Sequence, residues 1–318
     1  MTHIRRHPGV GLVLGGALSV QFGSAVAALL FPRAGVSAVV TLRLAIAAIV
    51  LLAVCRPRVR GYARADWALI AGFGVALAGM NTLFYHAIDR IPLGLAVTLE
   101  VLGPLALSVL TGRRAANWLW AGLALVGVAL LGRTGFDRLD PAGIAFALGA
   151  AAMWAAYIVL SARVGSRFPK LDGLALAMTV AAALTLPLGI GPALLHPPVL
   201  ALGAAVAVLS SLLPYTLELT ALRRMPTATF AVLMSLGPAI ATLAGFLVLS
   251  QHLTVTEGLA TVLIISASIG AVRKPGERPD TRPPARRPHV RARTHMPRHV
   301  RAREHTAPGR SRARQPIA

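Results

Sequence analysis

The stretch PLGLAVTLEVLGPLALSVL, residues 92–110, indicates the kind of fold that this 318-residue chain adopts. It is apolar except for a few small polar residues and one carboxylate, Glu100. A helix of this length spans most of a bilayer core about 30 Å thick. A charge at the bilayer centre costs from about 2.5 kcal/mol to more than 10 kcal/mol, depending on the method. Glu100 must therefore face a cavity, find a partner or stay protonated.

Similar apolar runs recur along the chain and are separated by short connectors rich in Pro, Gly, Arg and Asp. Runs of this length predict membrane-spanning helices, because backbone polar groups in lipid have to be satisfied within each segment. The sequence therefore predicts an all-α integral membrane protein with ten transmembrane helices. The predicted spans are 9–30, 36–54, 67–88, 93–110, 115–132, 141–162, 172–190, 199–221, 227–249 and 255–272. The first run has a basic flank like that of a signal peptide, but it continues to Leu30, so we expect it to be retained.

The basic residues are unevenly distributed. The net charge is +21, and 14 of the 32 Lys and Arg residues follow residue 272. We expect the segment 273–318 to be a disordered cytoplasmic tail, which either binds anionic lipids or has no specific partner. This concentration of charge argues against nucleic-acid binding. With the N-terminus in the cytoplasm, connectors on the cytoplasmic side hold thirteen basic residues before the tail, and those on the outer side hold four. This bias predicts that both termini are cytoplasmic.

The two halves of the chain match partially when they are shifted by 134 residues. IPLGLAVTLEVLGP (91–104) then falls on MPTATFAVLMSLGP (225–238), with Gly-Pro aligned in both copies. Five spans in each half would give the second copy the opposite membrane orientation, which is the inverted-repeat plan of secondary transporters. The alternative is chance matching of apolar sequence. We expect a first repeat at 1–138, a second at 139–272 and the tail at 273–318. Four prolines within spans favour kinks: Pro104, Pro187, Pro214 and Pro238.

Few charged residues lie within the predicted spans. Glu100 is about 10 Å from the outer end of its helix, and we expect it to bind a proton or an ammonium group rather than serve packing alone. Glu218 is about 6 Å from the inner end; it either shares this role or pairs with Arg223 or Arg224. Arg43 is expected to hold a substrate carboxylate, neutralise a glutamate or extend outward to the membrane surface.

Further polar and amphipathic side chains within the spans are expected to line a cavity, although any one of them can serve as a helix-packing hydrogen bond. These are Gln21, Asn81, Tyr85, Trp154, Tyr157 and Tyr215. The single cysteine, Cys55, cannot form an intramolecular disulfide, and no metal-ligand or nucleophile spacing occurs. We therefore expect no metal, no cofactor and no enzymatic activity. Two function classes stay open: a transporter of a small polar metabolite, and a membrane scaffold or receptor acting through its tail.

Two longer motifs resemble a known family. GMNTLFYHAIDRIPLGLAVTLEVLGPLA (79–106) and LSSLLPYTLELTALRRMPTATFAVLMSLGP (209–238) are similar to the threonine/homoserine exporter branch of the EamA-type drug/metabolite transporters. The resemblance covers about residues 9–272. It implies ten helices in two inverted repeats, an inner-membrane location, and export of small amino acids or related metabolites by proton exchange. Glu100 and Glu218 stand where that branch carries glutamate.

The sequence departs from the family pattern at two places. In the ninth predicted helix Gly237-Pro238 replaces the usual Glu-Pro, and Ser250-Gln251 replaces the usual Gly-Glu. The matching position of Glu100 in the second repeat is Met234. Glu100 is thus expected to be the principal membrane carboxylate, while the coupling ion and the substrate stay open.

Overall fold

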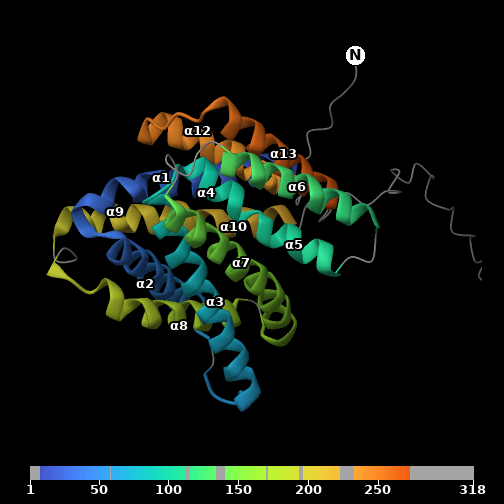
Figure 1. Cartoon of the computed structure of the whole chain (residues 1–318). Coiled ribbons are helices and arrows are strands. Elements are labelled where there is room, and N and C mark those ends of the chain that lie inside the picture. Colours follow the sequence, from blue (N-terminus) through green and yellow to red (C-terminus); the bar gives the residue numbers. More distant parts are fainter. Residues whose placement is uncertain are drawn as a thin grey trace, which may run out of the picture. The chain divides into compact units, whose positions relative to one another are not determined.

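The structure is a computed structural model that describes residues 8–57, 59–111, 115–133, 140–169, 171–192, 196–222 and 233–272. All of these residues belong to one compact unit. The regular elements of the described residues are all helical, which confirms the all-α class (Figure 1). The predictions for the tail at 273–318 and for the start of the ninth span lie outside the described residues.

The helices follow the predicted apolar runs. Their bounds are α1 (Pro8–Ala34), α2 (Val36–Cys55), α3 (Arg64–Ile88), α4 (Leu93–Glu100), α5 (Leu102–Thr111), α6 (Ala115–Arg133), α7 (Pro141–Arg167), α8 (Asp172–Gly189), α9 (Pro197–Ala207), η2 (Val208–Leu212), α10 (Leu213–Leu222), α12 (Gly237–Leu249) and α13 (Val255–Val272). Within the described residues, five helices are long and apolar enough to cross a membrane: α1, α2, α3, α7 and α8. The other apolar segments found there are shorter.

Three of the predicted spans are interrupted next to a proline. The fourth is divided at Val101 into α4 and α5, because Pro104 has no N–H to donate to the carbonyl of Glu100. The eighth contains η2, a short π-helical turn, and Pro214 is the second residue after it. In the ninth, a turn at Ser235 and Leu236 directly precedes Gly237-Pro238, where α12 begins. Pro187, in contrast, lies within a continuous helix, α8. The interruption after α4 makes Glu100 the last residue of a half-length helix.

Most of the packing brings a helix of the first half against a helix of the second half. Helix α3 packs on α7 and α8, α2 on α8 and α9, and α6 on α13. Helix α1 packs on α9, η2, α10 and α12, while α4 packs on α12 and α7. The largest fully buried side chains include Tyr85, Phe73 and Met178, which come from α3 and α8. The interior is therefore shared between the halves.

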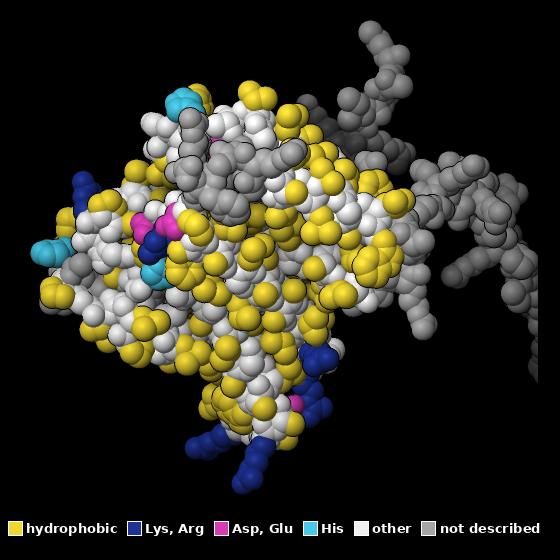
Figure 2. Space-filling view, viewed as in Figure 1, with side chains coloured by type: hydrophobic (Ala, Val, Ile, Leu, Met, Phe, Trp, Pro, Cys, Tyr) yellow, Lys and Arg dark blue, Asp and Glu magenta, His cyan; other side chains and the backbone are white. Residues whose placement is uncertain are grey.

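The exterior suits contact with lipid. Figure 2 shows hydrophobic side chains distributed across the whole visible face, with most of the visible Lys and Arg at the end near the start of α3. Large apolar side chains such as Ile49, Leu119 and Leu125 are more than half exposed. A soluble domain would leave such surfaces unfavourably hydrated, whereas hydrocarbon solvates them.

Two ion pairs join residues at or near helix ends of the two halves. Arg167 donates from Nε to Asp66 at 2.7 Å, and Arg90 donates from Nη1 to Asp140 at 2.9 Å. Asp140 is also the N-cap of α7, and it accepts the N–H of Ala142. The hydrogen bond from Arg90, followed by that from Ala142, holds the pKa of Asp140 below its ordinary value. Each pair joins residues that the predicted topology puts on the same side of the membrane.

Candidate functional site

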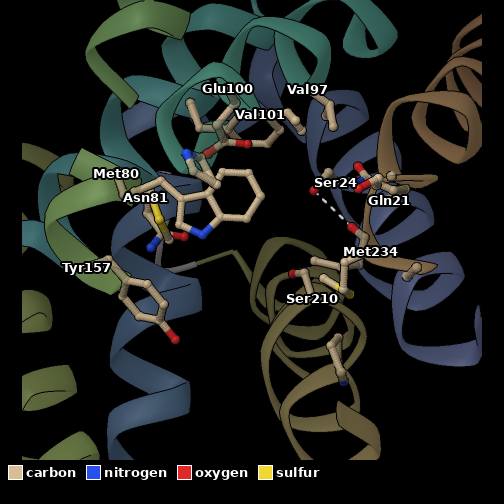
Figure 3. A pocket seen from close by; sticks show the side chains of 18 of the residues that line it. Gln21, Ser24, Met80, Asn81, Val97, Glu100, Val101, Tyr157, Ser210 and Met234 are labelled. Atoms are coloured by element: carbon tan, nitrogen blue, oxygen red, sulfur yellow. Dashed lines mark hydrogen bonds between the residues drawn. The ribbon is translucent and has the colours of Figure 1, made fainter. Parts of the chain in front are cut away.

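The described residues enclose a cavity of about 420 Å³. It is lined by residues from both halves of the chain, on α1, α2, α3, α4, α5, α7, η2, α10, α12 and α13, and its wall is mostly apolar. Six of the nine residues predicted for a binding site line it: Gln21, Arg43, Asn81, Glu100, Trp154 and Tyr157. Figure 3 shows Glu100, Asn81, Tyr157, Gln21 and Ser210 converging on this space from different helices.

Glu100 enters the cavity from the C-terminal end of α4. Within the described residues, its carboxyl group makes no hydrogen bond and no ion pair within 4 Å. Its own backbone carbonyl cannot be paired by Pro104, which has no N–H. The C-terminal end of a helix also carries a partial negative charge. A carboxylate, a carbonyl and a helix C-terminus at one place make this wall of the cavity suitable for a cationic group or a proton.

Arg43 lies on α2, with 7% of its surface exposed, and is held by residues from both halves. Its Nε donates to the Ser211 hydroxyl at 3.1 Å and its Nη2 to the Ser210 carbonyl at 2.7 Å. Its Nη1 donates to the Tyr85 hydroxyl at 3.1 Å, and the guanidinium carbon lies 5.3 Å from the Tyr85 ring centroid. The side chain therefore points inward, and the alternative in which it extends to the membrane surface does not describe this structure.

These three bonds leave part of the Arg43 donor capacity available. A guanidinium has five N–H groups, so two remain after the bonds to Ser211, Ser210 and Tyr85. Arg43 also lines the cavity, where a planar guanidinium can bind a carboxylate with two parallel hydrogen bonds. The same cavity thus holds one acidic and one basic side chain, and no ion pair within 4 Å joins them in the described structure.

The other predicted residues have different positions. Tyr85 is fully buried behind Arg43 and is not among the residues that line the cavity, so it contacts the site through the guanidinium. The Nδ2 of Asn81 donates to the Leu77 carbonyl at 2.8 Å, and Asn81 lines the cavity from α3. The side chains of Tyr215 and Glu218 lie outside the described residues, so the role predicted for each stays a prediction.

Several cavity residues were missed by the sequence reading. Four serines line the cavity: Ser24, Ser210, Ser235 and Ser268. A serine in a membrane helix commonly bonds a carbonyl of the preceding turn, as Ser24 does to Val20 and Ser268 to Ile264. The sequence therefore offers no signal that separates these serines from packing residues.

The two departures from the family pattern have different structural settings. Gly237 and Met234 line the cavity, so the replaced glutamate of the ninth helix falls at the site itself. Gln251 lies beyond the end of α12, where its Oε1 accepts the N–H of Leu93 at 3.0 Å. This bond satisfies one of the unpaired donors at the start of α4. Gln251 is therefore a helix-capping residue, and Gly237 marks the change inside the cavity.

An apolar exterior, an all-helical body and an internal cavity with one acid and one base are the features of a membrane transport protein. Comparison with known proteins gives the same class. The profile of the EamA-like transporter family matches residues 141–273. The threonine/homoserine exporter RhtA of Escherichia coli (strain K12) is 42% identical over 258 residues, which cover 80% of this chain and 87% of that protein. The threonine/homoserine exporter RhtA of Salmonella typhimurium (strain LT2) is equally similar, with the same coverage.

A solved structure described as "Crystal structure of protein" has the same fold, with a TM-score of 0.51 and 22% identity over 82% of this chain and 98% of its own. The chain therefore belongs to the EamA-like transporter family, in the branch that contains these exporters. The relatives are exporters rather than enzymes, in agreement with the sequence prediction. The protein is accordingly a multi-pass membrane protein.

Proposed function

We propose that this chain exports threonine, homoserine or similarly small amino acids across the inner membrane, in exchange for protons. The observation that carries the proposal is that Glu100 and Arg43 line one cavity of about 420 Å³. The curated relatives, named threonine/homoserine exporters, support the same substrate class. An amino acid carries one ammonium and one carboxylate group, so a cavity with one group of each charge complements it.

The two ends of the substrate have distinct partners in this proposal. The ammonium group binds the Glu100 carboxylate and the Glu100 backbone carbonyl at the end of α4, to which Pro104 cannot donate. The carboxylate binds the two N–H groups that Arg43 does not use internally. The hydroxyl and amide groups of Ser24, Ser210 and Asn81 supply partners for a hydroxyl on the substrate side chain.

Proton coupling follows from competition at Glu100. A proton and an ammonium group cannot both occupy the carboxylate, so each is released when the other binds. If the cavity opens alternately to the two sides of the membrane, this competition exchanges a substrate for a proton. Since Gly237 replaces the glutamate usual in the family, Glu100 performs the exchange without a second carboxylate at that position.

The proposal includes two inverted five-helix repeats, 1–138 and 139–272, with both termini in the cytoplasm. The helix bounds support it: α1 shifted by 134 becomes 142–168, close to α7, and α3 becomes 198–222, close to the span from α9 to α10. The packing supports it as well. The contact of α3 with α7 has its counterpart in the contact of α1 with α9 and α10, and α3 with α8 has its counterpart in α9 with α2.

Two contacts between a glycine and a leucine are related to each other by the same shift of 134 residues. A Cβ placed on Gly149 would lie 3.1 Å from Leu83, and one placed on Gly15 would lie 3.6 Å from Leu217. Each residue of the second contact is related to one of the first by the shift of 134. The asymmetry of Lys and Arg supports the cytoplasmic position of the termini, and the tail at 273–318 is then placed where anionic lipid head groups can hold it.

Transport by membrane vesicles tests the proposal. A proton gradient is imposed on inside-out vesicles that contain the protein, so that the vesicle lumen is acidic, and uptake of labelled threonine is followed. We expect threonine to accumulate above its external concentration, and a protonophore to abolish the accumulation. Vesicles without the protein provide the background. Equal uptake by both kinds of vesicle would refute the proposed function.

A further inference from the structure

The π-helical turn η2 lies where the second half of the chain meets α1 and α2. Inside it the hydrogen-bond pattern shifts by one residue: the N–H of Leu213 donates to the Val208 carbonyl. In an α-helix that N–H would bond the carbonyl of Leu209, and the N–H of residue 214 would bond the carbonyl of Ser210. Residue 214 is a proline and has no N–H. The local sequence therefore frees two neighbouring carbonyls from these helical donors.

Both freed carbonyls accept hydrogen bonds from other helices. The Leu209 carbonyl accepts the hydroxyl of Ser19 on α1. The Ser210 carbonyl accepts Nη2 of Arg43 on α2 at 2.7 Å, and the adjacent Ser211 hydroxyl accepts Nε of the same guanidinium at 3.1 Å. Ser210 and Ser211 are almost completely buried, with 2% and 1% exposed. The turn therefore accepts hydrogen bonds from Nε and Nη2 of the guanidinium, while the Tyr85 hydroxyl accepts one from Nη1.

We propose that η2 is the positioning element of the binding site: through Ser211 and the carbonyl that Pro214 leaves free, it orients Arg43 toward the substrate carboxylate. This inference rests on the proposed function, and it adds the origin of selectivity for a free carboxylate. When the Nε–H and one N–H of Nη2 are held by hydrogen bonds, the guanidinium plane is fixed, and the N–H groups that remain point in one direction. An Arg43 side chain released from the turn would spread over several rotamers, and each hydrogen bond to the substrate would then have to overcome that entropy.

Serine and proline variants test the proposal by different routes. Ser211→Ala removes the acceptor of Nε and leaves the backbone unchanged. Pro214→Ala supplies an N–H that competes with Arg43 for the Ser210 carbonyl. Matched controls lie away from the cavity: Ser266→Ala removes an exposed hydroxyl that bonds the Val262 carbonyl, and Pro187→Ala changes an exposed proline inside α8.

The readout is a comparison of two inhibitors in reconstituted vesicles that take up labelled threonine. Unlabelled threonine carries the carboxylate, whereas threoninamide has nearly the same shape without it. We expect the wild-type protein and both controls to prefer threonine strongly. In Ser211→Ala and Pro214→Ala we expect the half-inhibitory concentration of threonine to rise about tenfold, the effect of one hydrogen bond to a charged group, while that of threoninamide stays constant.

The outcomes separate this inference from the proposed function. If the wild-type protein does not take up threonine at all, the proposed function fails. If the wild-type protein discriminates and both variants discriminate equally well, the positioning role is refuted. A parallel loss of affinity for threonine and threoninamide would also refute it, because that result indicates general distortion. If Pro214→Ala does not fold, as judged by its thermal unfolding, Ser211→Ala decides the question alone.

Discussion

Gly103 lies three residues after Glu100, where α5 packs against α7, and its replacement by alanine tests how closely this part of the site is packed. A Cβ at this position would lie 2.7 Å from the carbonyl carbon of Ala151 and would overlap the carbonyl oxygen. Both are backbone atoms, so no side-chain rotation can relieve the contact. Reaching the 3.4 Å at which ordinary contact begins requires the two helices to separate by more than about 0.7 Å.

The expected effect combines two opposing contributions. Overpacking of this kind costs about 1–3 kcal/mol, and alanine regains about 0.5–1 kcal/mol of helix propensity over glycine. Gly103→Ala should therefore destabilise the protein by about 1–2 kcal/mol, which lowers Tm by about 1.5–3 °C for a chain of this size. Thermal unfolding in detergent, followed by the loss of helical circular dichroism, measures the shift.

Gly122→Ala is the matched control, since Gly122 lies on an exposed part of α6 and a Cβ there meets nothing within 4 Å. It gains the helix propensity without the collision, so its Tm should equal or exceed that of the wild-type protein. A Gly103→Ala variant as stable as Gly122→Ala would show that α5 and α7 are not in backbone contact. The described position of α5, and with it the break after Glu100, would then be refuted.

Four further predictions concern other parts of the chain. Ser250→Gly should raise stability by about 0.5–1 kcal/mol in thermal unfolding, because Ser250 ends α12 in the left-handed conformation (φ 53°) that glycine adopts without strain; no change would contradict that conformation. Arg43→Lys should reduce threonine uptake about tenfold, because one ammonium group cannot donate to Ser211, Tyr85 and the Ser210 carbonyl and still bind a carboxylate bidentately. Unchanged uptake would show that Arg43 does not bind the substrate. Deleting residues 273–318 should leave threonine uptake intact, whereas a total loss would favour a scaffold or receptor acting through the tail. Because the folded-state pKa of Asp140 is depressed, its pairing with Arg90 stabilises the fold above the ordinary pKa of about 3.8, and this stability is lost as the pH falls through the folded-state pKa. Asp140→Asn keeps the N-cap but not the charge, so the wild-type protein should have a slightly higher Tm than this variant at pH 7 and the same Tm in strong acid. A difference in Tm that persists in strong acid would contradict the pairing of Asp140 with Arg90.

The helices were predictable because a membrane imposes a simple rule on sequence. Apolar runs long enough to cross a bilayer have to be helical, and the bounds of α2 and α8 differ from the predicted spans by one residue. The break after Glu100 was also indicated, since Pro104 removes the donor that would pair the Glu100 carbonyl. The π turn was not, because a proline alone does not tell whether a helix kinks or changes its hydrogen-bond register.

The role of Arg43 depended on contacts that a linear reading cannot supply. Its acceptors at Ser210 and Ser211 are 167 and 168 residues away in sequence. The choice between an inward and an outward guanidinium therefore depended on how the two halves pack. Tyr85 was grouped with the cavity residues because an aromatic residue with a polar tip gives the same signal at a cavity wall as directly behind it. The residue types indicated that a polar site exists, whereas the direction in which each side chain points could be seen only in the tertiary structure.

The proposed exchange of an amino acid for a proton depends on the Glu100 carboxylate, which Glu100→Gln removes. The variant keeps the size and polarity of the side chain but can neither bind a proton at neutral pH nor form an ion pair with an ammonium group. Glu257→Gln is the matched control, because the Glu257 carboxylate accepts the N–H of Thr254 at the start of α13 and is not among the residues that line the cavity. In inside-out vesicles with an imposed proton gradient, we predict that Glu100→Gln abolishes the gradient-driven accumulation of threonine and that Glu257→Gln preserves it. Normal accumulation by Glu100→Gln would show that transport is not coupled to protons through Glu100.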